Sequence, residues 1–518
     1  MDGRRFPACL FCDLRRDLSV WWSEKHFAGG LEKTARGPFL TSFFPPLLLL
    51  LLGGVLFFAR LGCPLLEPEE ARYAEIPRQM LAEGRWLTPV LHGEDYYQKP
   101  PLLYWCIMVC YQIFGVHDWA ARLVPATAGI LVVLLTYGWA RQTVGPRAAL
   151  ASGLILCLSA RFLYLDGMVG MDSLLCLWVI GALACGHLAL APIGRHSRDR
   201  VGGFWWLSSA LCCGLGIMTK GPVTAVLVLG PLMAWQYLER CPAVSLGRWF
   251  GYVGVALLVA GPWYVAGALH DPDATGTFFW LHNIVRYLAP FDHEKPSWFY
   301  LPGLLIGMLP WTFLLIPLVP YLTRRSPRWA RRRPAGLGLF LLAFLWCLLF
   351  FSLSGCKRAG YILPALPALA LVLGTFLARA FSWNTRTQAV WALTNGTTAV
   401  ALILASYVML PGYHSRFGLR AVVCPHVGLA RDVAVVCYPR RWDSVSFYLG
   451  REVACFGSEE LGQLIGRLHD SKTLLFVKNG NAFDDMLRAL PQDLEFVPRG
   501  RQGPNVRVGM VQRICPKS

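Results

Sequence analysis

Residues 66–101 read LEPEEARYAEIPRQMLAEGRWLTPVLHGEDYYQKPP, and the rest of the chain is organised around this polar stretch. An apolar segment long enough to cross a bilayer precedes it, and another apolar run follows it. Because charge inside the hydrocarbon layer is costly, the stretch must lie in water at a membrane face. A loop rich in carboxylates and aromatic rings suits a reaction site, although a solvated loop with ordinary surface charge is the alternative. Its charged residues are Glu67, Glu69, Glu70, Arg72, Glu75, Arg78, Glu83, Arg85, Glu94, Asp95 and Lys99.

The composition places most of the chain in lipid. Of its 518 residues, 55% are hydrophobic and only 15% are charged, whereas soluble domains carry roughly 25% charged residues. A formal charge of +18 would suggest a nucleic-acid partner for a soluble protein. In a membrane protein, topology explains it better, because Lys and Arg collect in cytoplasmic loops. We therefore expect an integral membrane protein that does not bind nucleic acid.

Residues 1–41 are predicted to form a basic cytoplasmic tail. They contain seven Lys and Arg residues and no small-residue cleavage site after an apolar core, so they do not read as a signal peptide. The 17 cysteines are scattered, and many lie in apolar segments, where Cys acts as a small hydrophobe. Cys9-x-x-Cys12 lacks a second ligand pair, which argues against a zinc site.

Apolar segments of about 17–24 residues predict a polytopic α-helical membrane protein. The shorter run 101–115 is expected to lie against the outer face as a helix. Without it the chain has about eleven spans; if it crosses the membrane, one more break must exist elsewhere, so we expect about 11–13 transmembrane helices. The expected spans lie near 42–60, 119–140, 148–165, 173–192, 203–219, 222–238, 249–268, 299–322, 336–353, 361–380 and 389–410.

The distribution of arginine predicts which connections face the cytoplasm. With the tail inside, alternate connections are basic, above all the RRSPRWARRR run at 324–333. The opposite connections mix acids, His, Lys and aromatic residues: the loops 62–100 and 270–298, the turns at Asp172 and Lys220, and the turn 354–360. We therefore expect these five features to share the outer face of the membrane.

Beyond about residue 411 the pattern changes to that of a small soluble α/β domain, 411–518, on the outer face. Short alternating or apolar runs predict strands at 432–438, 473–478, 494–497 and 506–513. Helical periodicity appears near 458–468 and 480–490.

The acids of the first outer loop are the leading catalytic candidates. Glu69 and Glu70 precede Arg72, a pattern that suits a carboxylate held ionised by a nearby cation and able to act as a base. Acids after Pro68 also suit the first turn of a helix, and both interpretations can hold at once. Asp172, at the edge of an apolar segment, is the third candidate, although it could be an ordinary helix-end charge.

Cations on the same face are candidates for binding a phosphate. Lys99 follows two tyrosines at the start of an apolar run, where snorkelling interfacial Lys is the alternative. Lys220 stands in a Lys-Gly-Pro turn between two spans, and Lys357 and Arg358 add charge in the turn 354–360. A cavity near Lys99, Lys220, Arg286 and Lys357 would suit a phosphate or pyrophosphate, because cations compensate the charge of its oxygens. Since the chain has no nucleotide fingerprint, we expect a membrane-embedded activated donor.

The loop 270–298 also raises the question of a metal ion. His282, His293 and nearby acids could ligate one, but their spacing matches no strong zinc pattern. We assign no residue to a metal, and the cofactor is left open: a divalent metal is compatible with the sequence and not required by it.

Seven segments resemble the bacterial 4-amino-4-deoxy-L-arabinose transferases and the wider protein-mannosyltransferase-like family of C-type glycosyltransferases. The resemblance covers roughly residues 42–380 in consistent order. The segments are EPEEARYAEIPRQM, GRWLTPVLHGEDYYQKPPLLYW, FGVHDWAARLVPA, MDSLL, MTKGP, RYLAPFDHEKPSWFYLPGLLIGMLPW and SLSGCKRAGYILPALPALAL.

The resemblance implies transfer of a sugar from a polyprenyl phosphate, such as undecaprenyl phosphate, to a periplasmic acceptor such as lipid A, another lipid or a protein. It implies a transmembrane glycosyltransferase domain at 42–410 and a small periplasmic domain at the C-terminus. The family's usual Asp-Glu pair reads Glu69-Glu70 here, so the leading acid is one methylene longer, and its Glu-Lys-Pro-Pro reads Gln98-Lys99-Pro100-Pro101, so position 98 offers no negative charge.

The residue roles that follow form three groups. Glu69, Glu70 and Asp172 are predicted to be catalytic. Lys99, Arg286, Tyr361 and Lys220 are predicted to bind the donor phosphate, and Arg72, Tyr73, Tyr96 and His282 to bind substrate.

Two other classes of function compete with the transferase. A flippase or transporter of an anionic glycolipid would carry internal repeats and broken helices around a midplane site, and no convincing repeat is visible. A non-catalytic sensor would leave the elaborate 62–100 loop without a purpose. The transferase predicts that Glu69, Lys99 and Asp172 share one cavity.

Overall fold

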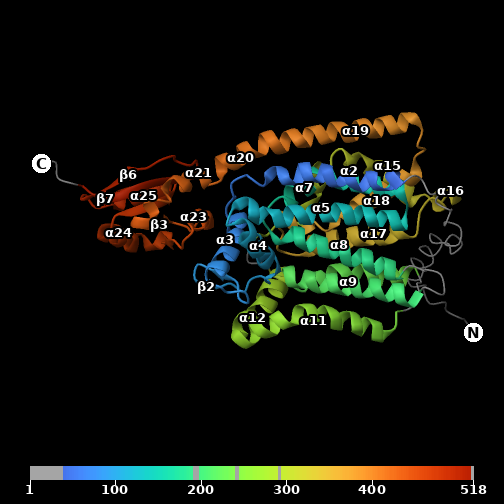
Figure 1. The fold of residues 1–518 in the computed structure, drawn as a ribbon, viewed down its shortest axis with the longest axis horizontal. Helices are drawn as coiled ribbons and strands as arrows, with labels where there is room; N and C mark the ends of the chain where they lie inside the picture. Colours follow the sequence, from blue (N-terminus) through green and yellow to red (C-terminus); the bar gives the residue numbers. More distant parts are fainter. Residues whose placement is uncertain (1–38, 191–197, 240–243, 290–292, 515–518) are drawn as a thin grey trace, which may run out of the picture.

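The protein is a bundle of long helices with a small α/β region attached at one end (Figure 1). The computed structural model describes residues 39–190, 198–239, 244–289 and 293–514. The predicted tail 1–41 therefore lies outside the described residues up to residue 38, and the first described helix, α2, spans Phe39–Phe57.

In the described part of the chain, eight helical segments are long and apolar enough to cross a membrane, or ten if each of two bent pairs is one span. The multi-pass helical fold is thus confirmed. The spanning segments include α2, α5 (Asp118–Thr143), α8 (Met171–Leu190), α9 (Arg198–Lys220), α11 (Leu246–His270), α17 (Gly336–Leu353), α18 (Ala365–Ala380) and α19 (Thr385–Leu404), which continues through η6 (Ala405–Met409) into α20 (Leu410–Phe417).

Two predicted spans are broken. The segment expected at 148–165 is α6 (Pro146–Cys157) and α7 (Ala160–Asp166), bent by 61°. The segment expected at 299–322 is α14 (Tyr300–Gly307) followed by η4 (Trp311–Leu314) and α15 (Leu315–Thr323), bent by 103°. Both bent pairs remain apolar enough to count as one span each.

The two breaks lie against each other, which explains them. At the first, the hydroxyl of Ser159 donates to the carbonyl of Gly307 at 3.3 Å. The indole of Trp311 donates to the carbonyl of Leu158 at 3.4 Å. Pro310, at the second break, has no N–H for a helical hydrogen bond. A side chain at each break therefore donates a hydrogen bond to a backbone carbonyl at the other break. Inside a membrane such carbonyls need a partner from the protein, because no water is available.

Two further apolar helices are short. α4 (Leu102–Phe114) has 13 residues and packs against α3 (Glu69–Ala82) and α5, so the run 101–115 forms the predicted helix. α10 (Val223–Leu238) has only 16 residues, fewer than the span expected at 222–238. It packs against α8, α9 and α17.

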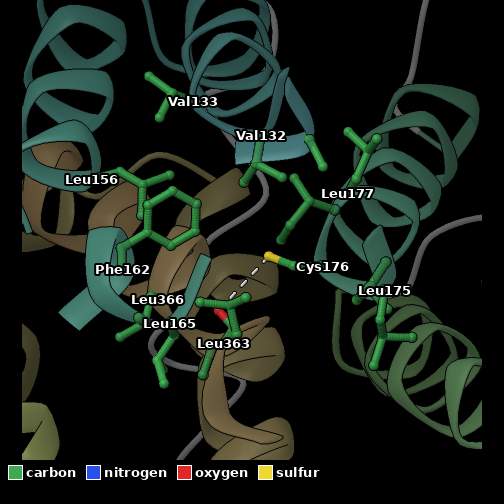
Figure 2. Packing of buried hydrophobic residues seen from close by; sticks show 14 of the residues in the cluster. Val132, Val133, Leu156, Phe162, Leu165, Leu175, Cys176, Leu177, Leu363 and Leu366 are labelled. Carbon is green, nitrogen blue, oxygen red and sulfur yellow. Dashed lines mark hydrogen bonds between the residues drawn. The ribbon is translucent and has the colours of Figure 1, made fainter. Parts of the chain in front are cut away.

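The core of the bundle lies where α5, α6, α7, α8 and α18 meet (Figure 2). Figure 2 shows Val132, Phe162, Leu177 and Leu366 converging on one apolar centre. Cys176 packs among them as a small hydrophobe, with its thiol 3.8 Å from the carbonyl oxygen of Leu363. By contrast, α11 and α19 expose rows of large apolar side chains, as lipid-facing helices do.

The C-terminal region contains a five-stranded sheet in the order β4-β3-β5-β7-β6. β3, β4 and β5 are parallel to each other, and β7 is antiparallel to both β5 and β6. The strands are β3 (Ala434–Tyr438), β4 (Ala454–Cys455), β5 (Thr473–Lys478), β6 (Leu494–Pro498) and β7 (Val506–Arg513).

Helices cover both faces of this sheet. α23 (Asp443–Leu449) packs on one face with Val435 and Phe476. α24 (Leu461–Asp470) and α25 (Asn481–Ala489) pack on the other with Val436 and Leu475. The four predicted strands and two helices are confirmed, whereas β4 and α23 are too short for the sequence pattern to predict.

Candidate functional site

The polar stretch that opens the sequence forms α3 and a two-stranded hairpin at the end of the bundle that also carries the C-terminal region (Figure 1). The hairpin pairs β1 (Val90–Leu91) with β2 (Glu94–Asp95). Glu69 and Glu70 occupy the first turn of α3, where the helix dipole favours acids. The helix-start interpretation of this pair is therefore confirmed, and it leaves the chemical roles of the two acids to be decided by their surroundings.

Glu69 faces an accessible, charged part of the site. Its side chain is 43% exposed and forms an ion pair with Arg358. Arg358 also bonds to the ring nitrogen Nε2 of His293 at 2.8 Å. Glu69 thus combines contact with solvent and a cationic partner, the combination expected of a carboxylate that acts on a substrate.

Glu70 is placed quite differently. It is fully buried, and its carboxylate accepts from Arg122 at 2.9 and 3.2 Å and from the backbone N–H groups of Leu66 and Val169. Burial alone would raise the pKa of Glu70, but the guanidinium of Arg122 outweighs it and the pKa is lowered. With both oxygens saturated and no exposed surface, Glu70 has no room for a substrate. Its placement favours a structural role, in contrast to the predicted catalytic one.

Asp172 and Lys220 meet where α8 begins and α9 ends. They form an ion pair, and the Lys220 ammonium lies 4.1 Å from the centre of the Tyr361 ring. The predicted tight turn after Lys220 is present, since Gly221 has φ +93° and a side chain there would meet Phe278 and Asn283. Predicted catalytic and phosphate-binding residues from three distant segments are thus brought together.

A cavity of about 190 Å³ opens beside this cluster, and we call it the cationic pocket. Its charged wall holds three of the predicted phosphate ligands, and the fourth, Tyr361, adds an aromatic ring. Much of the remaining lining is apolar. Glu69 and Asp172 do not line the cavity, so it does not hold Glu69, Lys99 and Asp172 together as predicted. The lining residues are Lys99, Lys220, Pro222, Val223, Val226, Asn283, Ile284, Arg286, Tyr287, Phe350, Phe351, Ser354, Cys356 and Tyr361.

Lys99 is the unusual member of the cationic pocket. Within the described part of the chain its ammonium makes no hydrogen bond or ion pair, although the residue is half-buried. Burial, followed by the charges of Lys220, Arg286 and Arg358, lowers the pKa of Lys99 to about 7, and the Asp172 carboxylate acts in the opposite direction. A cation held among cations in this way is stabilised when an anion binds.

Hydrogen bonds between two loops position the other two cations, Arg286 and Lys357. The loop that carries Arg286 is joined to the turn 354–358, because the N–H of Gly355 donates to Tyr287 and the N–H of Lys357 donates to His293. Arg286 Nε also lies 3.4 Å from the sulfur of Cys356. The Lys357 side chain is buried and donates to the carbonyl of Ser354, so it does not line the pocket as its charge suggested.

The predicted substrate-binding residues are divided. The Arg72 guanidinium lies 3.3 Å from the Asp443 carboxylate of the C-terminal region. Tyr73 packs on Tyr104 with 6.3 Å between ring centres, and burial raises its pKa. The Tyr96 hydroxyl donates to Gln98 at 3.1 Å. The side chain of His282 lies outside the described residues.

The sequence interpretation underrated three residues. Arg358 counted only as an added cation, although it holds Glu69. Glu67 and Asp443 connect the first outer loop to the C-terminal region. The charge of the turn 354–360 could have indicated Arg358. No local sequence pattern reveals contacts between residues as far apart in the chain as Glu67 and Ser444 or Arg72 and Asp443.

Among the described residues no group of three or more His, Cys, Asp and Glu side chains is placed to hold a metal ion.

The fold defined by these helices is that of a C-type glycosyltransferase. The chain superposes on the crystal structure of ArnT from Cupriavidus metallidurans bound to undecaprenyl phosphate with a TM-score of 0.74. The alignment covers 91% of this chain and 98% of that one at 21% identity. The family model of the dolichyl-phosphate-mannose-protein mannosyltransferases matches residues 65–278.

Two curated relatives carry the name undecaprenyl phosphate-alpha-4-amino-4-deoxy-L-arabinose arabinosyl transferase. The protein from Edwardsiella ictaluri is 32% identical over 362 residues, 67% of this chain and 62% of the relative. Arabinosyl transferase 2 from Pseudomonas fluorescens is 34% identical over 370 residues, 68% of this chain and 60% of the relative. The match thus spans less than two thirds of these relatives' length. The predicted resemblance to the aminoarabinose transferases and the protein-mannosyltransferase-like family is confirmed.

Proposed function

We propose that this protein is an integral-membrane glycosyltransferase that moves a sugar from a polyprenyl phosphate to an acceptor outside the cytoplasm. The sugar is aminoarabinose, as the relatives' names indicate, or another pentose or hexose. The acceptor is lipid A, another lipid or a protein. One observation carries the proposal: the Lys99 ammonium, which has no hydrogen-bond or ion-pair partner among the described residues, lines a cavity that it shares with Lys220 and Arg286.

The charged and the apolar parts of the cationic pocket suit the two parts of a lipid phosphate. Lys99, Lys220 and Arg286 surround the position for the phosphate, where their charges compensate its oxygens. Phe350 and Phe351 belong to the apolar part, which suits an isoprenoid chain. Undecaprenyl phosphate bound to the Cupriavidus metallidurans ArnT, which shares this fold, supports the same ligand class here.

The acids supply the acceptor side of the reaction. The bond between the anomeric carbon and the phosphate oxygen breaks, and the phosphate keeps the electron pair, which the three cations stabilise. The acceptor oxygen attacks from the opposite face of the sugar. In this proposal Glu69, helped by Asp172, orients that oxygen and takes its proton when the acceptor is a hydroxyl. An acceptor phosphate is already ionised, so it needs only positioning.

We assign the active face to the periplasmic side of a bacterial inner membrane. α3, α12 (Pro272–Phe279) and the C-terminal region lie at one end of the bundle, and α16 (Pro327–Ala330), within the basic run 324–333, lies at the other (Figure 1). Basic connections favour the cytoplasm. In this assignment residues 42–410 form the transferase domain and residues 411–518 the periplasmic domain.

Mass spectrometry of envelope lipids and proteins tests the function. We compare cells that lack this protein with cells that express it or its Lys99→Met variant. The expected result is one class of envelope molecule that gains the mass of a pentose or hexose only with the unaltered protein. Identical spectra in all three strains, with the lipid-linked donor redistributed between leaflets, would instead indicate a flippase.

A further inference from the structure

The C-terminal region is attached to the start of α3 by carboxylates. The carboxylate oxygen Oε1 of Glu67 accepts from the backbone N–H of Ser444 at 2.7 Å and from its hydroxyl at 2.5 Å. These two residues are 377 positions apart in the chain. Because Glu67 lies two residues before Glu69, the contact acts directly on the turn that presents the candidate catalytic acid.

Asp443 makes the complementary contact from the other side. It is buried and accepts from Arg72 Nε at 3.3 Å, and its other oxygen lies 2.7 Å from His92 Nε2. Arg72 belongs to the first turn of α3, and His92 lies in the β1–β2 hairpin. One buried acid thus connects both elements of the polar stretch to the C-terminal region.

The sheet topology indicates that Glu67 contacts the C-terminal region at the edge of the sheet where ligands usually bind. β3 lies between β4 and β5, with α23 on one face of the sheet and α24 on the other. The carboxyl end of such a strand is the switch point at which open α/β sheets bind their ligands. Ser444 follows β3 there, in the first turn of α23. The Glu67 carboxylate therefore occupies the place where this kind of sheet would otherwise take a ligand.

The environment of Glu67 favours the protonated form of its carboxyl group. Burial, and next the charge of Asp443, raise the pKa of Glu67 to about 7, while the two bonds from Ser444 and the charge of Arg440 act in the opposite direction. A glutamine at position 67 keeps an oxygen that can accept both bonds from Ser444, and it resembles the protonated acid. An alanine removes both bonds.

We propose that Glu67, Ser444 and Asp443 form a positioning contact for the transfer reaction, through which the C-terminal region fixes the first turn of α3 and holds Glu69 against Arg358. Glu67 does not touch the cationic pocket, so it acts through Glu69 and is a positioning residue. The kinetic part of this inference rests on the proposed function. The structural part, that Glu67 fixes the first turn of α3, does not.

Other contacts should keep the C-terminal region attached when Glu67 is changed. Arg78 donates to the carbonyl of Gly450 at 3.1 Å. The N–H of Leu65 donates to the Tyr448 hydroxyl at 2.9 Å, and Arg420 pairs with Asp118 at 2.7 Å. A Glu67 variant is therefore expected to fold and stay docked, with only the start of α3 released.

The test measures transfer kinetics and hydrogen exchange on the full-length protein. Glu67→Ala is expected to lower kcat roughly 10–100-fold, since small misplacements of catalytic groups have effects of this size. The KM for the lipid-linked donor should change less than twofold, because the pocket cations are untouched. Glu67→Gln should restore most of kcat. Glu83→Ala, at the exposed far end of the same helix, is the matched control and should behave as the unaltered protein.

Exchange at residues 66–73 separates the two proposals. Faster exchange in Glu67→Ala than in Glu83→Ala is expected, and it supports the positioning contact even if no transfer is detected in any variant. The inference is overturned if Glu67→Ala matches Glu83→Ala in both kcat and exchange. It is equally overturned if Glu67→Gln is as defective in kcat as Glu67→Ala, because the Ser444 bonds would then not be the cause.

Discussion

Lys99→Met is expected to lower kcat/KM for transfer by about 10²–10³-fold, the loss typical of removing one preorganised donor from a developing oxyanion. The methionine keeps most of the length and the apolar character of the side chain but lacks the terminal ammonium. Lys99 is the pocket cation without a partner among the described residues, so its charge is wholly available to a bound phosphate. Transfer from a lipid-linked sugar in proteoliposomes measures the effect. A loss below threefold would contradict the assignment of Lys99 to the phosphate.

The same lysine predicts how donor affinity depends on pH. Its pKa in the empty pocket is about 7, and a bound phosphate raises it. The charge therefore contributes its full attraction below pH 7, and the contribution is lost as the pH rises through the higher pKa of the complex. Donor affinity should fall by up to tenfold per pH unit above 7. Lys99→Arg, which stays charged throughout this range, is the control and should have a flatter profile.

Glu69→Gln is expected to lower kcat by roughly 10²–10⁴-fold if the acceptor is a hydroxyl, because general-base assistance is then lost. Glutamine keeps the shape and cannot take a proton. With a phosphate acceptor the loss should be smaller, since no proton has to be removed. The size of the effect therefore reports the acceptor class as well as the role of Glu69. Near-normal rates with a hydroxyl acceptor would contradict this role.

Glu70→Gln is the matched comparison for Glu69→Gln. It removes the negative partner of the buried Arg122 guanidinium, and breaking a buried ion pair typically costs about 3–5 kcal/mol of stability. We expect a lower melting temperature in detergent, measured by intrinsic fluorescence, with no selective loss of kcat in the fraction that remains folded. The reverse result, a stable protein without activity, would return Glu70 to the catalytic set.

Local sequence patterns were sufficient for much of the fold. The length of apolar runs identified helices such as α5 and α17, and short apolar or alternating runs identified β5 and β7. These signals are local, so they can be recognised in the sequence without knowing which segments pack together in the fold. The breaks in α6–α7 and α14–α15 were not predicted, because they depend on tertiary contacts such as Trp311 to Leu158.

The candidate site divides in the same way. The sequence identified Lys99, Asp172 and Lys220 because each is a charged residue at the edge of an apolar segment. Charged residues are rare in such segments because lipid disfavours them, so the few that occur stand out. It could not separate Glu69 from Glu70. Adjacent residues of a helix face different directions, and their partners, Arg358 and Arg122, are 289 and 52 residues away.

The fate of the lipid-linked sugar in sealed proteoliposomes tests the central claim most directly. The donor, labelled in both its sugar and its polyprenyl chain, is supplied with envelope acceptors to protein with and without the Lys99→Met substitution. We predict that the unaltered protein releases free polyprenyl phosphate in step with labelling of the acceptor. A carrier that keeps its sugar while crossing between leaflets would contradict the account.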